Sequence, residues 1–427
     1  MNADRTDERG IWRNRNFLLL LSGQVVSFVG NQVQDLALPL VVLALTGSPT
    51  QAGLMLGLHT AAYLLFGLVA GALVDRWDRK RTMIWCEILR GVLTGTVAVA
   101  LWLDLLGMPQ LYAVAILTGI LTTLFNSANS AAMPNVVSAE QLPGALGAAQ
   151  SSVNTIRIFG APFAGVVYAI GRTVPFLMNS VSFFISALAL RFIDTEFQAE
   201  KQLKPTPTRL TADIRDGLGW VWKQPVIRFL AFIQAGDNLR YGAGYLLIIM
   251  LATRLQSSPL EIGVVFSGAA VGALIGALAS SRITKKYPLG KVAAVMLWIE
   301  ALAFPLYAFA PNPWLLAGVA LLESIIAPIY GVAMSTYRLS ITPDHLRGRV
   351  HSAVSTLVTG AGSLGALLGG FLLAAIGPDS MVFASAAWLV LLAIATTANR
   401  TVRQAPVATE VKPVERNENG DVTRERR

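Results

Sequence analysis

The segment Gly71-Ala72-Leu73-Val74-Asp75-Arg76-Trp77-Asp78-Arg79-Lys80-Arg81 joins the end of one long apolar run to the start of the next. The hydrocarbon core of a bilayer is about 30 Å thick, so an apolar helix of roughly 20 residues crosses it once. A charged segment this short must then reverse the chain at one membrane surface. Its four basic residues predict that this surface is cytoplasmic, because short loops rich in Lys and Arg stay on that side.

The composition of the whole chain also predicts an integral membrane protein. Its 427 residues are 54% hydrophobic and only 14% charged, and the mean hydropathy is +0.56, which leaves too little polar surface for one or two soluble domains. The net charge of +9 alone could indicate nucleic-acid binding. However, 29 of the 34 Lys and Arg residues lie in alternate polar segments on one predicted side, and only Arg172 and Arg254 lie on the other. We therefore expect a multi-pass protein of the inner (plasma) membrane that contacts lipid, has both termini in the cytoplasm and binds no nucleic acid.

Residue types that carry enzyme chemistry are sparse. Cys86 is the single cysteine and the three histidines are scattered, so the chain can form no internal disulfide and no thiolate metal site. The segment 360–365 matches G-x-G-x-x-G, but no strand is predicted before it, so we interpret it as a helix-packing face like Gly268, Gly272 and Gly276. We expect no enzyme activity, no cofactor and no metal.

The apolar runs predict an all-α protein with twelve transmembrane helices in two six-helix repeats. A shift of about 205 residues places Gly71-Ala72-Leu73 on Gly276-Ala277-Leu278, which indicates that the halves are copies. Between them, Leu210, Ile214, Leu218 and Val221 recur at helical spacing, as in a helix along the cytoplasmic interface. The expected organisation is a cytoplasmic N-terminal segment, a first bundle, a linker with an interfacial helix, a second bundle and a disordered cytoplasmic tail, over residues 1–16, 17–193, 194–225, 226–399 and 400–427.

Polar side chains inside the apolar runs mark candidate functional positions. An unpaired polar group in hydrocarbon costs several kcal/mol, so such residues are expected to face a cavity or the bundle interior. Glu87 and Arg90, three residues apart, are expected to pair with each other near the cytoplasmic end as a structural contact. The remaining candidates are Asn31, Gln34, Asp35, Asn126, Asn129, Arg157, Asp237, Arg240 and Glu323.

The opening segment also resembles a known family. Gly71, Leu73, Asp75, Arg76, Arg79 and Lys80 fit the loop signature of the major facilitator superfamily, G-x-L-x-D-R-x-x-R-(K/R). Asp78 departs from the usual Gly, and the resulting D-R-x-D-R is similar to the branch of macrolide, multidrug and siderophore exporters. The antiport motif G-x-x-x-G-P-x-x-G-G is matched only at Pro162 and Gly165.

The resemblance implies alternating access, in which two six-helix halves rock about a central site lined by helices 1, 4, 7 and 10. It implies a secondary active exporter, acting as a monomer, that couples efflux of a drug-like or amphipathic small molecule to protons or another ion. Alternatives within transport are export of a siderophore or peptide-like metabolite, or movement of a lysolipid. An alternative of another class is a non-transporting membrane receptor.

Two groups of residues receive expected roles. Asp35 falls on Arg240 under the 205-residue shift, so we expect Asp35 to be the coupling carboxylate with Arg240 as its neighbour. A permanent Asp35–Arg240 ion pair and neutralisation of Arg240 by Asp237 both stay open, with Glu323 as a further coupling candidate. We expect Gly71, Asp75, Arg76, Arg79 and Lys80 to form a gating loop at the cytoplasmic seam, the alternative being a purely topological charge cluster.

Overall fold

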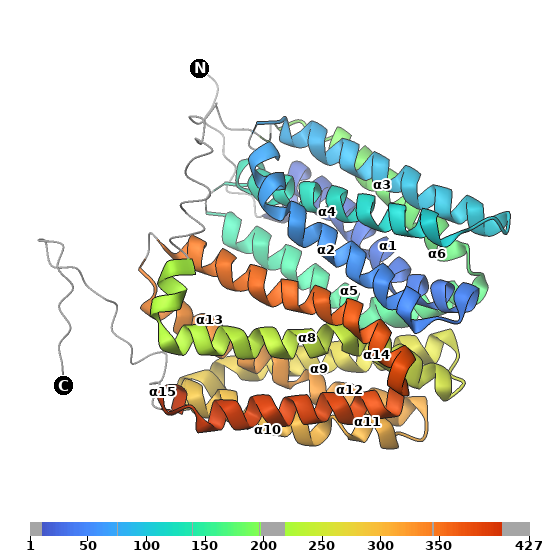
Figure 1. Cartoon of the computed structure of the whole chain (residues 1–427). Coiled ribbons are helices and arrows are strands. Elements are labelled where there is room, and N and C mark those ends of the chain that lie inside the picture. Colours follow the sequence, from blue (N-terminus) through green and yellow to red (C-terminus); the bar gives the residue numbers. More distant parts are fainter. Residues whose placement is uncertain are drawn as a thin grey trace, which may run out of the picture.

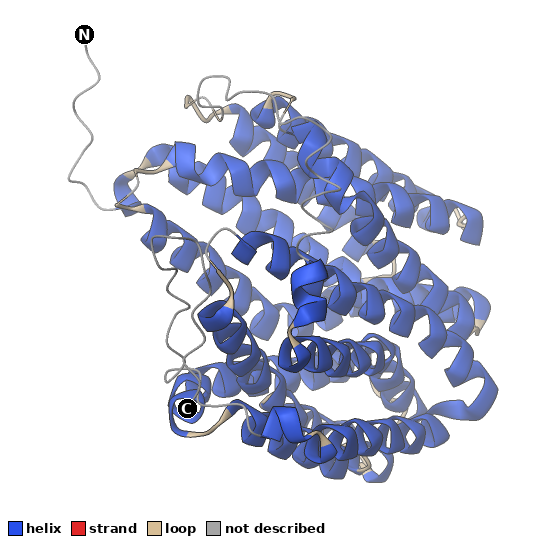
Figure 2. Ribbon diagram, turned by 60° about the vertical axis from the view of Figure 1, so that its left-hand side comes forward, coloured by secondary structure: helices blue, strands red, loops and turns tan. Residues whose placement is uncertain are grey.

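The computed structural model describes residues 11–74, 76–138, 140–195, 197, 218–343 and 346–403. Within these ranges the chain is almost entirely helical and contains no strand (Figure 2). Asp75, residues 1–10, Leu210 and Ile214 of the predicted interfacial helix, and the tail from 404 onward lie outside the described residues, whereas 218–223 are helical.

The first half of the chain, called the N-half here, forms six long helices after one short 3-10 helix. The elements are η1 (Ile11–Arg13), α1 (Arg15–Thr46), α2 (Pro49–Val74), α3 (Arg79–Trp102), α4 (Met108–Val136), α5 (Leu142–Ile170) and α6 (Val174–Arg191).

The second half, the C-half, repeats this plan with broken spans. Its elements are α8 (Pro225–Arg254), α9 (Pro259–Lys286), α10 (Leu289–Ala303), α11 (Leu306–Phe309), α12 (Pro313–Ser324), α13 (Ile326–Ile341), α14 (Arg347–Ala398) and α15 (Arg400–Arg403). Gly377, with φ +76°, divides α14 into two spans. Within the described part of the chain, α10 with α11 and α12 with α13 each make one span, which gives twelve and confirms the predicted count.

Caps and prolines determine where the helices begin. The Asp78 side chain accepts a hydrogen bond from the backbone N–H of Arg81 at 2.8 Å, so α3 starts at Arg79 and three basic residues of the predicted turn belong to its first turn. Prolines open α2, α8, α9 and α12, where the missing N–H is not needed. The predicted disordered tail is wrong at its start, because residues 400–403 form the short helix α15. Asn399 Oδ1 caps this helix by accepting hydrogen bonds from the N–H groups of Thr401 and Val402, and the Val402 side chain is buried.

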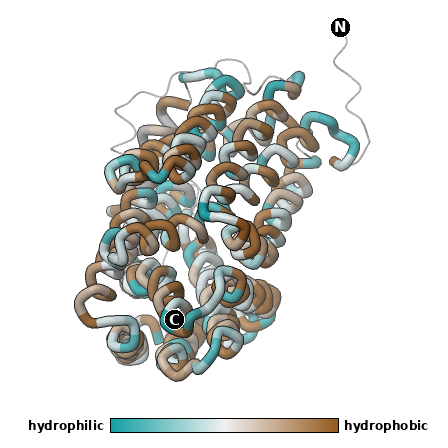
Figure 3. The backbone as a smooth tube through the Cα atoms, turned by 90° about the vertical axis from the view of Figure 1, so that its right-hand side faces the viewer, coloured by the Kyte–Doolittle hydropathy of each residue, from teal (hydrophilic) through white to brown (hydrophobic). Residues whose placement is uncertain are grey.

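The two halves lie side by side as separate bundles (Figure 1). Both ends of the described chain, Ile11 and Arg403, lie at the same end of the molecule, called the terminal end here; the turns at 47–48 and 255–258 lie at the opposite end. Large apolar side chains such as Trp102 and Leu278 are well exposed on the outside, and hydrophilic residues gather mainly in the turns (Figure 3). An apolar surface this extensive fits a lipid surrounding.

The halves approach each other most closely near the opposite end, along two helix pairs: α2 with α14, and α5 with α9. A Cβ built on Gly53 would lie 2.6 Å from Gly370 Cα, and one on Gly165 would lie 2.3 Å from the Pro259 carbonyl oxygen. Ser267 Oγ also donates a hydrogen bond across the interface to the Ile158 carbonyl at 2.7 Å. We call these contacts the seam.

Small residues also pack helices within the C-half, as predicted. Cβ atoms on Gly272 and Gly276 would lie 2.1 Å from carbonyl oxygens of the α12 span, and one on Gly365 would lie 1.9 Å from that of Leu239. The interpretation of the glycine segments in 268–276 and 360–365 as packing faces is therefore confirmed.

Candidate functional site

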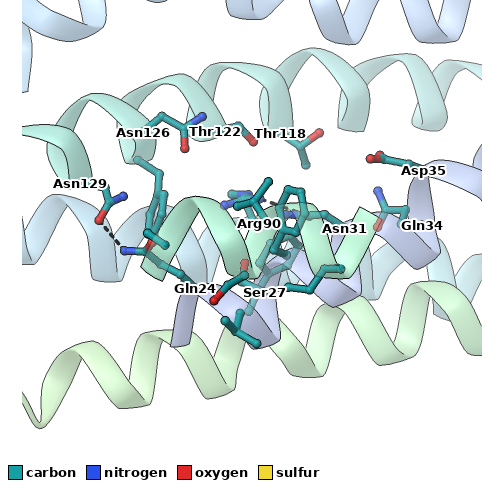
Figure 4. Close-up of a pocket in the computed structure, with 18 of the residues that line it drawn as sticks. Gln24, Ser27, Asn31, Gln34, Asp35, Arg90, Thr118, Thr122, Asn126 and Asn129 are labelled. Carbon is teal, nitrogen blue, oxygen red and sulfur yellow. Dashed lines mark hydrogen bonds between the residues drawn. The ribbon is translucent and has the colours of Figure 1, made fainter. Parts of the chain in front are cut away.

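A polar cavity of about 390 Å³ lies inside the N-half. Its lining reaches from Asp35 and Thr118, near the middle of the bundle, to Leu21 and Ala149 toward the terminal end. The polar residues of its wall include Gln24, Ser27, Asn31, Gln34, Asp35, His59, Arg90, Thr118, Thr122, Asn126, Asn129 and Ser152, most of them labelled in Figure 4.

The polar stripe of α1 forms one wall, because its members recur at spacings of three, four and seven residues along one helix face. Gln24 Nε2 donates to Asn129 Oδ1 at 2.6 Å and links α1 to α4 (Figure 4). Asn179 Nδ2 of α6 donates to Gln34 Oε1 at 2.7 Å. Hydrogen bonds between neighbouring helices thus hold the amides of this wall in place, as the sequence predicted for polar groups inside a membrane.

Arg90 lies in the cavity wall, which the sequence analysis missed. Its Nη1 is 3.3 Å from Glu87 Oε2, and its Nη2 donates to Asn31 Oδ1 at 3.3 Å. Glu87 accepts a further hydrogen bond from Ser186 Oγ at 2.9 Å, and the guanidinium carbon lies 4.1 Å from the centre of the Phe183 ring. The predicted pair is confirmed, but it lies mid-span rather than at the cytoplasmic end.

Asp35 lines the cavity, and the positive charges of Arg90 and Arg157 act on its carboxylate. Its backbone carbonyl accepts a hydrogen bond from Tyr245 Oη of α8 at 3.2 Å, a contact between the halves. Among the described residues no ion pair joins Asp35 to Arg240, and none joins the two halves. The expected Asp35–Arg240 neighbourhood is wrong, because Arg240 is surrounded by carboxylates of its own half.

Arg240 is the centre of a buried charge cluster in the C-half. Its Nε and Nη2 both donate to Asp237 Oδ1 at 3.1 Å. Nη2 also pairs with Glu300 Oε1 and lies 3.2 Å from Glu323 Oε1. The alternative in which Asp237 neutralises Arg240 is therefore the one that the structure contains. Glu300 was absent from the predicted site, although a carboxylate in the middle of an apolar run was a signal for it.

The resemblance implied that helices 1, 4, 7 and 10 line one central cavity. In the structure, their polar residues belong to two separate sites. Among the described residues, the cavity is lined by the N-half alone, whereas Asp237, Arg240 and Glu323 belong to the cluster. Of the residues proposed from the sequence for a substrate cavity, Asn31, Gln34, Asn126 and Asn129 lie in this wall, whereas Arg157 does not. In the described ranges no group of His, Cys, Asp and Glu is arranged to hold a metal ion.

The basic residues of the predicted gating loop contact backbone within the N-half. Arg79 Nη1 donates to the carbonyls of Ala131 at 3.0 Å and Phe197 at 3.3 Å. Lys80 Nζ donates to the Ile193 carbonyl at 2.5 Å. The start of α3 is thereby tied to the ends of α4 and α6, Arg76 is exposed, Gly71 lies in α2, and Asp75 lies outside the described residues.

Comparison with known proteins agrees with an architecture of membrane-spanning helices in two bundles. The family described as "Major Facilitator Superfamily" matches this chain over residues 20–236 and 237–422. The multidrug efflux pump Tap of Mycobacterium tuberculosis (strain ATCC 25618 / H37Rv) is 26% identical over 408 residues, which cover 93% of this chain and 97% of Tap. The enterobactin exporter EntS of Shigella boydii serotype 18 (strain CDC 3083-94 / BS512) is 26% identical over 403 residues, covering 91% of this chain and 94% of EntS.

A solved structure shows the same fold. A crystal structure of a variant of the nucleoside transporter NupG superposes with a TM-score of 0.76 at 13% identity, over 90% of this chain and 99% of NupG. Two bundles of six membrane-spanning helices around a polar interior define a membrane transporter. The chain belongs to the Major Facilitator Superfamily.

Proposed function

We propose that this protein is a secondary active exporter that works by alternating access. The observation that carries the proposal is the asymmetry of the bundle: a polar cavity reaches from the middle toward the terminal end, while the halves are closely packed at the opposite end. This is the arrangement of a transporter open toward one side of the membrane. The halves that move are residues 17–193 and 226–399, joined by the linker 194–225.

The substrate we propose is a drug-like or amphipathic small molecule. A volume of about 390 Å³ lies within the range of about 300 to 1,000 Å³ typical of pockets for such ligands. The wall combines amides with the rings of Phe28, Phe125 and Phe183, so it offers both apolar contact and hydrogen bonds. A siderophore or peptide-like metabolite is the second candidate, favoured by the amide-rich wall and by the likeness to EntS.

The terminal end is the cytoplasmic end in this proposal. The basic segments that the positive-inside rule assigns to the cytoplasm, including 76–81 and 282–291, lie at that end. The protein would then sit in the inner (plasma) membrane as a monomer with both termini inside. In this orientation the present state accepts substrate from the cytoplasm.

Coupling to an ion gradient supplies the energy, and we propose protons exchanged in antiport. The candidates for coupling are Asp35, Arg240, Asp237 and Glu323, and the gating loop we propose comprises Gly71, Asp75, Arg76, Arg79 and Lys80. In an outward-open state the loop's charges would leave their N-half carbonyls and bridge the two halves at the terminal end. Arg157, whose positive charge acts on Asp35 from outside the cavity wall, would contact the substrate.

The test is transport by purified protein in liposomes. Ethidium serves as the amphipathic probe and enterobactin as the siderophore probe, each with and without an imposed pH gradient. Accumulation of ethidium against its concentration gradient, only when the pH gradient is present, is the expected result. Accumulation of enterobactin alone would favour the second candidate, and no gradient-dependent movement of any probe would favour a receptor.

A further inference from the structure

The C-half cluster holds more negative charge than its one guanidinium can balance. Asp237, Glu300 and Glu323 surround Arg240, and their side chains are 14%, 6% and 9% exposed. If all three carboxylates were ionised, the cluster would carry two uncompensated negative charges. An unbalanced buried charge costs several kcal/mol, so this site has a physical reason to bind a positive ion.

The buried pair of the N-half provides the contrast. Glu87 and Arg90 balance each other one to one, and Ser186 and Asn31 supply further hydrogen bonds. That pair is neutral without another ion. Among the buried charged groups that the structure describes, only those of the C-half therefore contain more carboxylates than cations.

Two buried hydroxyls near the cluster have no hydrogen-bond partner within the described residues. Tyr307 and Tyr330 are only 2% and 5% exposed, and each hydroxyl is unpaired. Tyr307 interacts electrostatically with Glu323, Arg240 and Glu300, and Tyr330 with Asp237 and Glu300. A phenol can donate to a carboxylate or accept from a protonated carboxyl, so both can adapt to either state. Among the described residues, Tyr241 of α8 also interacts electrostatically with Glu323, Arg240 and Asp237.

Both glutamates stand next to a break in their span. Glu300-Ala-Leu-Ala-Phe-Pro305 and Glu323-Ser-Ile-Ile-Ala-Pro328 share the spacing Glu-x-x-x-x-Pro. The prolines cannot donate to the carbonyls of Ala301 and Ser324, and α10 and α12 end at Ala303 and Ser324. The backbone stays helical at both breaks, with φ/ψ of −59°/−40° at Phe304 and −63°/−29° at Ile325, so each proline removes one backbone hydrogen bond close to a glutamate without unwinding the span.

The geometry within the cluster distinguishes the three acids. Asp237 accepts two hydrogen bonds from the guanidinium, whereas Glu300 accepts one. Glu300 and Glu323 both pair with Nη2 of the same guanidinium, so the two carboxyl groups meet at one nitrogen atom. Two carboxyl groups placed in this way can bond to each other only when one carries a proton, because an ionised carboxylate has no donor.

We propose that the coupling proton binds to the Glu300–Glu323 carboxyl pair, with Asp237 as the permanent counter-ion of Arg240. The proposal builds on the proposed ion-coupled export and narrows the coupling site to the C-half. The guanidinium already occupies the space between the carboxylates, which favours a proton over a larger metal ion. Asp35 then faces the substrate cavity and does not carry the coupling proton.

Infrared difference spectroscopy on protein in lipid nanodiscs tests this without any transport. The wild type should show, at neutral pH, the C=O stretching band of a protonated carboxyl group. Glu300→Gln and Glu323→Gln should each lose this band, Glu300→Asp should keep it, and Asp35→Asn should keep it as the matched control. Absence of the band from the wild type, its survival in both Gln variants or its loss in Asp35→Asn would overturn the proposal.

Liposomes separate failure of this site from failure of the proposed function. Gln resembles a protonated Glu, so Glu300→Gln should fold and should exchange ethidium across the membrane without a gradient. Its pH-gradient-driven accumulation of ethidium should fall at least about tenfold, a barrier change of about 1.4 kcal/mol. Full gradient-driven accumulation in Glu300→Gln would reject the site while leaving the export function intact. No accumulation by the wild type, with the infrared band present, would reject coupled export while leaving the proton site intact.

Discussion

Replacement of Gly53 by Ala should move the protein out of its present state. The added Cβ would lie 2.6 Å from Gly370 Cα, 2.8 Å from its nitrogen and 2.9 Å from the Ala366 carbonyl oxygen. All three are backbone atoms, so no side-chain rotation relieves the overlap. Carbon atoms prefer separations of about 3.5 to 4.0 Å, so α2 and α14 must separate locally by about 1 Å.

Overpacking of this kind costs about 1 to 3 kcal/mol. The cost applies only while the halves are closed at the opposite end, since Gly53 and Gly370 belong to different halves. The population of the present state, relative to the state opened there, should therefore fall by about 5 to 150-fold.

Pulsed electron spin resonance on nitroxide labels at positions 172 and 256, one in each half beside the seam, measures this population directly. Cys86 is buried, so labels at introduced cysteines dominate the signal. The distance distribution should shift to longer values in Gly53→Ala. Gly67→Ala on the same helix is the matched control, because a Cβ there has no neighbour within 4 Å. An unchanged distribution in well-folded Gly53→Ala protein would refute the assignment of the seam as the closed gate.

Three further outcomes are expected. Gly276→Ala should lower the yield of folded protein in detergent, because its Cβ would lie 2.1 Å from a backbone oxygen, while Gly318→Ala, in open space, should not; equal yields on size-exclusion chromatography would contradict the packing role. Arg90→Ala should lower the free energy of unfolding by about 3 to 5 kcal/mol, because Glu87 would stay buried without its ion-pair partner. The midpoint of thermal unfolding should fall, and an unchanged midpoint would contradict the role of the pair. The swap Asp35→Arg with Arg240→Asp should not restore ethidium transport lost in either single variant, because it adds a fourth acid to the cluster; recovery would support a direct pair.

Much of the architecture could be predicted because the membrane leaves few options. Runs of apolar residues long enough to span lipid must be helices, and the short turns between them set the count. The polar stripe of α1 was readable for the same reason: amides such as Asn31 and Gln34 cannot face hydrocarbon. The breaks at Pro305 and Pro328 could have been predicted, because proline has no backbone N–H to continue the helix. They were not predicted, because the apolar run continues on both sides of each proline.

The partners of the charged residues could not be predicted from spacing along the chain. Glu87 and Arg90 pair within one helix, but spacing does not tell which neighbouring helix that face meets, so the position of Arg90 in the cavity was missed. The 205-residue shift relates Asp35 to Arg240 by equivalent place in each half. Equivalent place does not imply proximity, and Arg240 instead meets Glu300 from a span whose register relative to α8 depends on packing.

The seam is made of backbone against backbone, with Gly53 against Gly370 and Gly165 against Pro259, and no described ion pair crosses it. A gate of this construction excludes water and ions by shape alone, so it should seal against leakage even while the proton site changes its charge. Its opening should depend little on ionic strength, since screening acts on charges and the seam has none in its described contacts. The protein can thus separate the part that seals from the part that responds to the gradient.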